Sequence, residues 1–307
     1  MKRISLLFVC ALLTGCNSQP NLFDGEIAFQ YLEQQCQLGP RNPGSEGHAK
    51  AKDFYLDFFT NLADTVIRQD IERYIERDSL SLPLTNIIAG FALEQGNPLL
   101  LGAHWDTRPW ADHDPDPQKR NQPILGANDG ASGVAVLMHL AELLQQQAPN
   151  RTVYIVLFDG EDYGSAEDLS YYCLGSEYFA KNLPIERPRE AIIIDMIGDA
   201  DLQISVERNS YRSHPNLVKI IWDIAKARNY EEFVHQLDNE IYDDHLMLIS
   251  YANIPAIDII DFDYPNRFTN YWHTTEDTPD KCSPQSLAIV GQVLHDYIYE
   301  NYSLQVK

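Results

Sequence analysis

Hydrophobic and polar positions follow two patterns along the chain, one typical of amphipathic helices and one typical of buried strands. Apolar residues spaced three and four apart predict amphipathic helices at 51–62, from about 131 to 144, at 217–224 and at 287–298. Short runs that are almost wholly apolar predict buried strands at 86–91, 98–104, 152–158, 191–195 and 256–260.

The order of these elements predicts the fold class. Strands that alternate with helices indicate an α/β fold, which we expect to form one domain of three layers, with helices on both faces of a mostly parallel central sheet. In such sheets ligands bind beyond the carboxyl ends of the strands, so the loops that follow the predicted strands are where a functional site is expected.

The first residues read as a targeting segment rather than as part of this fold. Lys2 and Arg3 precede an apolar run at 4–13, which is too short to span a bilayer, and the run ends in Thr14-Gly15-Cys16. This resembles a bacterial lipobox, so we expect a lipoprotein signal peptide at 1–15, a lipidated Cys16 with a short tether at 16–21, and the catalytic domain at 22–307. An ordinary signal peptide with an incidental cysteine is the alternative.

The targeting segment implies a location for the protein. It predicts export and a lipid anchor at Cys16 on the periplasmic side of a bacterial membrane, and Asn17 in place of Asp favours the outer membrane by resemblance to lipoprotein sorting. Three cysteines remain after Cys16, at 36, 173 and 282. An exported protein can form disulfides, but Cys36, Cys173 and Cys282 form one at most, and the sequence does not select the pair.

Composition narrows the possible functions. The chain has 307 residues, of which 44% are hydrophobic, and a formal net charge of −22. This composition is that of a folded protein, and its acidity argues against nucleic acid as a partner, because binding to nucleic acid requires a basic face. None of the cysteines lies in a CxxC pair, so a thiolate zinc site is not expected either.

Histidine and acidic residues recur where predicted strands end or predicted helices begin. Singly, each is most simply a turn residue, a helix cap or a satisfied core residue. Together, two imidazoles and five carboxylates at one sheet edge favour a catalytic zinc site, because zinc takes both ligand types and keeps a position open for substrate. The set comprises His104, Asp106, Asp129, Glu161, Asp162, Asp195 and His273.

Spacing within this set predicts a division of roles. His104 and Asp106 are two positions apart on a strand, so both are expected to face the metal, and Asp129 can bridge or ligate. Of the adjacent Glu161 and Asp162, one is expected to bind metal and the other to act as general base with a raised pKa. The segment 243–245 (DDH) either lines the site or begins a helix, and 112–114 (DHD) is interpreted as a solvated loop.

Several segments around these residues resemble a known enzyme family. They are GAHWDT (102–107), GANDGASG (126–133), DGED (159–162), DMIG (195–198) and HT (273–274), and they are similar to the co-catalytic zinc aminopeptidases and the related glutaminyl cyclases. The flanking segments RPWADHD (108–114) and CLGS (173–176), with Trp272 before His273, resemble bacterial members of the animal-type glutaminyl cyclases, or glutaminyl-peptide cyclotransferases. The resemblance covers nearly all of the chain after the leader.

The resemblance implies a role for each residue. Zinc would be held by Asp129, Asp162 and His273, and Glu161 would be the acid–base. Asp195 and Asp243 would hydrogen-bond around the reacting groups. Trp272, Tyr264 and Tyr172 would wall the substrate pocket. Animal cyclases have two glutamates where this chain has Glu161-Asp162, a difference that we interpret as a variant.

Three functions are consistent with these residues. The first is a one-zinc cyclase that converts the N-terminal Gln of peptides or exported proteins to pyroglutamate and releases ammonia. The second is a two-zinc aminopeptidase, in which His104 and Asp195 complete a second metal site. The third is a catalytically inactive binding module, which would be expected to have lost ligands, whereas all seven positions are filled.

Overall fold

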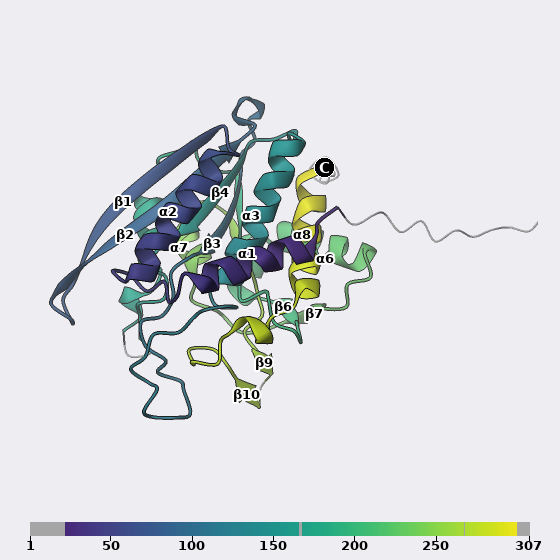
Figure 1. Ribbon diagram of the computed structural model, residues 1–307. Coiled ribbons are helices and arrows are strands. Elements are labelled where there is room, and N and C mark those ends of the chain that lie inside the picture. The colour runs from purple at the N-terminus through teal and green to yellow at the C-terminus, as the bar shows by residue number, and fades with distance from the viewer. Residues whose placement is uncertain (1–21, 166–167, 267, 300–307) are drawn as a thin grey trace, which may run out of the picture.

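A six-stranded sheet lies between layers of helices in the computed structural model (Figure 1). The structure describes residues 22–165, 168–266 and 268–299. The predicted signal peptide and the predicted lipidation site at Cys16 lie outside the described residues. No helix within the described ranges is both long enough and apolar enough to cross a membrane.

The sheet has the order β1-β2-β4-β3-β5-β8. Its parallel part consists of β3 (Leu99–His104), β4 (Val153–Phe158), β5 (Glu190–Asp195) and β8 (Ala256–Ile260). Every residue of β3, β4 and β8 is buried, as expected for parallel strands covered on both faces. The antiparallel hairpin of β1 (Thr65–Ile75) and β2 (Leu80–Phe91) extends the sheet next to β4.

Helices cover both faces of the sheet, which confirms the predicted α/β fold with a mostly parallel sheet. The larger core joins one face to α1 (Gly25–Gln37), α2 (Glu46–Thr60), α3 (Ala131–Gln146), α6 (Pro215–Ala227) and α8 (Pro284–Tyr299). On the other face pack α4 (Leu174–Lys181) and α7 (Asp244–Ala252). The predicted helices and strands all have counterparts here, whereas α1, α4 and β1 were not predicted.

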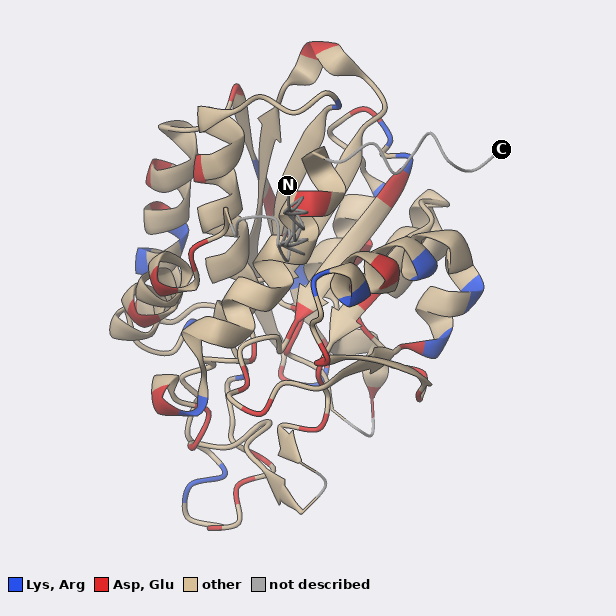
Figure 2. Ribbon diagram, turned by 90° about the vertical axis from the view of Figure 1, so that its right-hand side faces the viewer, with Lys and Arg blue, Asp and Glu red and all other residues tan. Residues whose placement is uncertain are grey.

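Shorter elements lie at the carboxyl end of the sheet and at its periphery. They are α5 (Arg208–Ser213), the pair β6 (Ile204–Val206) and β7 (Phe233–Leu237), the pair β9 (Pro265–Asn266) and β10 (Thr269–Asn270), and the 3-10 turns η1 (Leu93–Gln95), η2 (Leu169–Tyr171) and η3 (Pro279–Lys281). Cys36, Cys173 and Cys282 are buried and free. Figure 2 shows acidic segments among the loops below the sheet, where the parallel strands end.

Candidate active site

A cavity of about 350 Å³ opens at the carboxyl edge of the sheet, where β3, β4, β5 and β8 end. The loops after these strands, the start of α7 and the segment before α3 supply its wall. Predicted site residues that line the cavity are Asp129, Glu161, Asp162, Tyr172, Asp195, Asp243, Trp272 and His273. The strand order therefore brings residues from distant parts of the sequence to one place.

Three of these side chains form a compact cluster. His273 Nε2 lies 3.1 Å from Asp162 Oδ1 and 3.7 Å from Asp129 Oδ2, and all three side chains are buried. Ligand atoms around a tetrahedral zinc ion are about 3.3 Å apart for bonds of about 2.0 to 2.1 Å. Asp129 Oδ2 has no hydrogen-bond partner among the described residues, so a cation would satisfy an atom that the protein leaves unpaired. The donor set and its spacing fit zinc.

A second cluster shares Asp129 with the first. His104 Nε2 lies 3.1 Å from Asp129 Oδ1 and 3.1 Å from Asp195 Oδ1. Asp129 thus presents one carboxylate oxygen to each cluster, which is the geometry of a ligand that bridges two cations. The arrangement accommodates the one-zinc and the two-zinc alternatives alike.

Asp106 has a different role from the one predicted. Its carboxylate accepts hydrogen bonds from the backbone N–H groups of Glu161 (3.0 Å) and Asp162 (3.2 Å), so the prediction that it faces the metal together with His104 is wrong. Instead it fixes the turn after β4 that carries Glu161 and Asp162. At Gly130 (φ +101°), an added Cβ would lie 2.7 Å from the Asp106 carbonyl oxygen, so the chain before α3 requires glycine there.

Asp277 fixes the backbone on the other side of the site. It accepts hydrogen bonds from the N–H groups of Asn128 (2.8 Å) and Asp129 (3.1 Å), and from the hydroxyl of Tyr264 (2.9 Å). Tyr264 is 1% exposed and is not among the residues that line the cavity. The structure therefore places Tyr264 behind the site, where it supports Asp277, and not on the pocket wall where the family resemblance would put it.

Arg108 is a buried cation beside one of the ligands. Its Nη1 donates to Asp162 Oδ1 (3.1 Å) and to the Asp162 carbonyl oxygen (3.2 Å), while Nε and Nη2 each donate to Asp112 at 2.7 Å. The guanidinium orients Asp162 and offsets part of the negative charge of the cluster. Sequence reasoning noted Arg108 only as part of a motif and assigned no role to it.

The two adjacent acids after β4 have pKa values shifted in opposite directions. Burial raises the pKa of Glu161 well above its ordinary value, and the neighbouring Asp162 carboxylate adds to this rise. Burial acts in the same direction on Asp162, but His273 and Arg108 outweigh it and hold the pKa of Asp162 below its ordinary value. This difference favours Asp162 as the anionic member of the cluster and Glu161, at the cavity wall, as the group suited to accept and return a proton.

Aromatic rings form much of the remaining wall. Trp272 stacks on His273 with ring centroids 3.7 Å apart and contacts Phe262 at 4.9 Å and His113 at 4.6 Å. His113 is exposed and lines the cavity, so its interpretation as part of a solvated loop missed a position on the wall. Tyr172 lines the cavity as the family resemblance implies.

Both interpretations of the segment 243–245 describe part of its role. Asp243 caps the N-terminus of α7 and also lines the cavity. His245 is buried behind it, with Nε2 3.4 Å from Glu207 Oε2 and Nδ1 3.8 Å from Asp258 Oδ2. Neither Glu207 nor Asp258 was predicted to belong to the site. Glu207 precedes the short helix α5 and Asp258 lies within the short strand β8, and no recognisable motif surrounds either residue.

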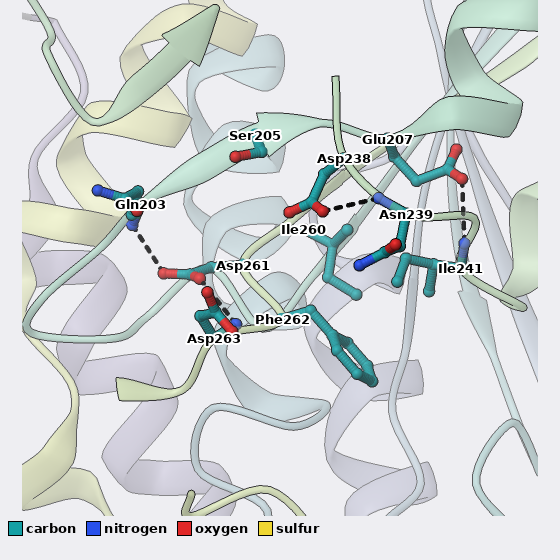
Figure 3. Close-up of a pocket in the computed structure, with 10 residues that line it drawn as sticks. All are labelled: Gln203, Ser205, Glu207, Asp238, Asn239, Ile241, Ile260, Asp261, Phe262 and Asp263. Carbon is teal, nitrogen blue, oxygen red and sulfur yellow. Dashed lines mark hydrogen bonds between the residues drawn. The ribbon is translucent and has the colours of Figure 1, made fainter. Parts of the chain in front are cut away.

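A smaller cavity of about 70 Å³ adjoins the first (Figure 3). The two share Ile241, Ile260 and Phe262 as lining residues. Figure 3 shows Asp261 accepting a hydrogen bond from the Gln203 backbone, at 2.7 Å. Burial raises the pKa of Asp261 to about 7. The lining of the smaller cavity includes Glu207, Asp238, Asp261 and Asp263, so acidic residues are frequent on this side of the larger cavity as well.

Fold and site together define the class of protein. A mostly parallel sheet that gathers His and carboxylate ligands at its carboxyl edge is the arrangement of the zinc aminopeptidase-like metalloenzymes. The chain belongs to peptidase family M28, whose family model matches residues 86–298.

Solved structures and a characterised relative support the same class. A zinc-dependent exopeptidase from Parabacteroides distasonis is 34% identical, with a TM-score of 0.87 over 92% of this chain and 99% of that one. A glutaminyl cyclase from Bacteroides thetaiotaomicron is also 34% identical, with a TM-score of 0.87 over 91% of this chain and 98% of that one. The glutaminyl-peptide cyclotransferase of Drosophila melanogaster is 22% identical over 82% of this chain and 75% of its own length. Family and neighbours imply zinc.

Proposed function

We propose that the protein is a zinc-dependent glutaminyl-peptide cyclotransferase that converts N-terminal Gln to pyroglutamate. The observation that carries the proposal is the wall formed by Trp272, which stacks on His273 beside the ligand cluster. A flat indole next to the cation site suits a planar side-chain amide. The flanking segments that resemble glutaminyl cyclases, and solved neighbours of that name, add support.

The proposed reaction needs the substrate, a base and a polarised carbonyl. Zinc held by Asp129, Asp162 and His273 would supply Lewis acidity toward the Gln side-chain carbonyl. Glu161 accepts a proton as the neutral α-amine attacks the amide carbon, and it returns that proton to the departing nitrogen. One carbon–nitrogen bond forms to close the five-membered ring, and the bond to the amide nitrogen breaks, so the products are pyroglutamyl peptide and ammonia.

The neighbouring carboxylates position the attacking group. Asp195 and Asp243 line the cavity with Glu161, so they are placed to accept hydrogen bonds from the α-amine. Attack within a single residue has a high effective molarity, because little translational entropy is left to lose. Only the first residue enters the reaction, which allows many peptides or exported proteins to serve as substrates.

The second candidate is a two-zinc aminopeptidase. The cluster of His104, Asp129 and Asp195 favours it, as does the likeness to a zinc-dependent exopeptidase. In that case Glu161 would activate a water molecule rather than an amine. A catalytically inactive binding module is the third candidate, but the retained ligand set gives it no support.

One assay separates these candidates. The zinc-loaded protein is offered a peptide that begins with Gln and a matched peptide that begins with Leu, and the products are analysed by mass spectrometry and by an ammonia assay. Ammonia release with the mass loss of one ammonia from the Gln peptide supports the cyclase. Free leucine from the second peptide supports the aminopeptidase, and a zinc-loaded protein inactive on both supports the binding module.

The proposed location follows from the leader alone. Lys2 and Arg3, the apolar run and Gly15-Cys16 support export and a lipid anchor at Cys16 on the periplasmic side, with the outer membrane favoured by Asn17. The Cys16→Ser variant should move from the membrane fraction to the soluble fraction. An unchanged distribution would contradict the anchor.

A further inference from the structure

A cysteine that the proposed mechanism does not use lies against the proposed acid–base. The thiol of Cys173 donates to Glu161 Oε1, with Sγ and Oε1 3.5 Å apart. Asp243 completes a group of three, in which one ligand atom from each residue lies within 4.8 Å of the others. Cys173 and Asp243 are 0% and 3% exposed, and Asp243 Oδ2 has no hydrogen-bond partner among the described residues.

The spacing of this group matches a metal site. A zinc–sulfur bond of about 2.3 Å and a zinc–oxygen bond of about 2.1 Å at the tetrahedral angle place sulfur and oxygen about 3.6 Å apart. The observed 3.5 Å is therefore close to the length of one edge of such a coordination tetrahedron. We propose that Cys173, Glu161 and Asp243 form an inhibitory site for a thiophilic divalent cation, such as Cd²⁺ or Zn²⁺ in excess of the catalytic ion.

A cation has a route to the two carboxylates of this site and a reason to enter the cavity. Glu161 and Asp243 line the cavity, so an ion that enters the cavity meets their carboxylates without any opening of the core. The lining residues, all within the described ranges, include several carboxylates and neither Lys nor Arg. Negative charge focused in a cleft raises the local concentration of cations.

Binding would remove the acid–base from the reaction. The thiol loses its proton to solvent as sulfur coordinates the ion, and the Glu161 carboxylate that accepts the substrate proton becomes a ligand instead. Soft thiolate sulfur selects Cd²⁺ and Zn²⁺ over Mg²⁺ and Ca²⁺, which take oxygen ligands. This consequence rests on the proposed role of Glu161, whereas the site itself rests only on the geometry of the three side chains.

The test adds Cd²⁺ to the zinc-loaded enzyme and follows three quantities. These are turnover of the Gln peptide, near-ultraviolet charge-transfer absorption from a cadmium thiolate, and the zinc retained by the protein. We expect absorption that saturates at one added cation per chain, a parallel loss of turnover, and no release of zinc. In Cys173→Ala we expect no absorption, and the Cd²⁺ concentration for half-inhibition, relative to that variant's own rate without cadmium, to rise about ten-fold or more.

Controls make each outcome decisive. Cys36→Ala removes a buried free thiol of α1 and should respond to Cd²⁺ as the wild type does, while Mg²⁺ at the same concentration should not inhibit. Equal cadmium binding by Cys173→Ala and the wild type, or inhibition that tracks zinc release, overturns the proposal. If the protein is inactive on Gln and Leu peptides, the absorption still tests the site, so the failure of the proposed function is distinguishable from the failure of this inference.

Discussion

Asp277 offers the sharpest test of how the protein positions a metal ligand. Its carboxylate accepts three hydrogen bonds, from the N–H groups of Asn128 and Asp129 and from the Tyr264 hydroxyl. In Asp277→Asn the amide keeps one acceptor oxygen and places an NH₂ group where the other oxygen was. If the amide oxygen keeps the bonds from Asn128 and Tyr264, the Asp129 N–H then faces a donor.

The magnitude follows from that single lost bond. A hydrogen bond to a charged acceptor contributes about 1.5 to 3 kcal/mol, so the free energy of unfolding should fall by about that amount. Because the lost bond holds the backbone of Asp129, a proposed zinc ligand, zinc affinity should also fall, by about 10- to 100-fold. Tyr264→Phe removes one neutral donor and leaves both backbone bonds, so its cost should be about 1 kcal/mol with little change in zinc affinity.

Two measurements on each variant check this reasoning. Chemical denaturation of the metal-free protein gives the free energy of unfolding, and competition with a chromophoric chelator gives the zinc affinity. Asp280→Asn, an exposed substitution three residues along, serves as the matched control. Zinc affinity equal to wild type in Asp277→Asn, alongside a lowered stability, would refute the claim that Asp277 positions Asp129.

Three further predictions concern the base, the wall and a buried ion pair. Glu161→Gln should keep its zinc and lose about 10²- to 10⁴-fold in kcat for the Gln peptide; retained turnover would remove Glu161 as acid–base. Trp272→Ala should raise KM for the Gln peptide more than it weakens zinc binding. An unchanged KM would contradict the claim that Trp272 forms the wall of the substrate pocket. Burial opposes the charge of Glu190, yet His214 and Arg151 outweigh it and lower the pKa from 4.5 to about 2. This group therefore stabilises the fold above pH 4.5 and loses that contribution as the pH falls toward 2; Glu190→Gln should cost about 3 kcal/mol at neutral pH. Denaturation at several pH values should show this difference shrinking in acid, and a constant difference would contradict it.

Most of the sheet was predictable because its strands are buried on both faces. A short apolar run such as 99–104, with helical patterns before and after it, is predicted to be a buried strand. The strand β1 escaped prediction because it is an edge strand that alternates exposed charged residues with partly buried ones, which leaves only a weak apolar pattern. The helix α1 was missed because its buried face includes a polar residue, Gln35, which interrupts the apolar pattern. The Gln35 side chain donates hydrogen bonds to the Tyr31 and Ala131 carbonyl oxygens.

The site was predictable only as far as strand ends determine it. A residue at the end of a strand, such as Asp195 at the end of β5, reaches the carboxyl edge whatever the loops do. Asp106 was predicted to face the metal rather than to support the site, and Asp277 was not predicted at all, because each binds backbone groups that are distant in sequence and only the closed loops bring them together. Tyr264 shows the opposite error: the family resemblance implied a place on the pocket wall, whereas the side chain turns inward and packs against Met196 and Ile260.

X-ray diffraction from crystals of the zinc-loaded protein, recorded on both sides of the zinc absorption edge, tests the central claim most directly. We expect an anomalous peak within bonding distance of His273 Nε2, Asp162 and Asp129, whether or not a second peak lies beside His104. A fully loaded, active protein with no zinc at these three side chains would contradict it.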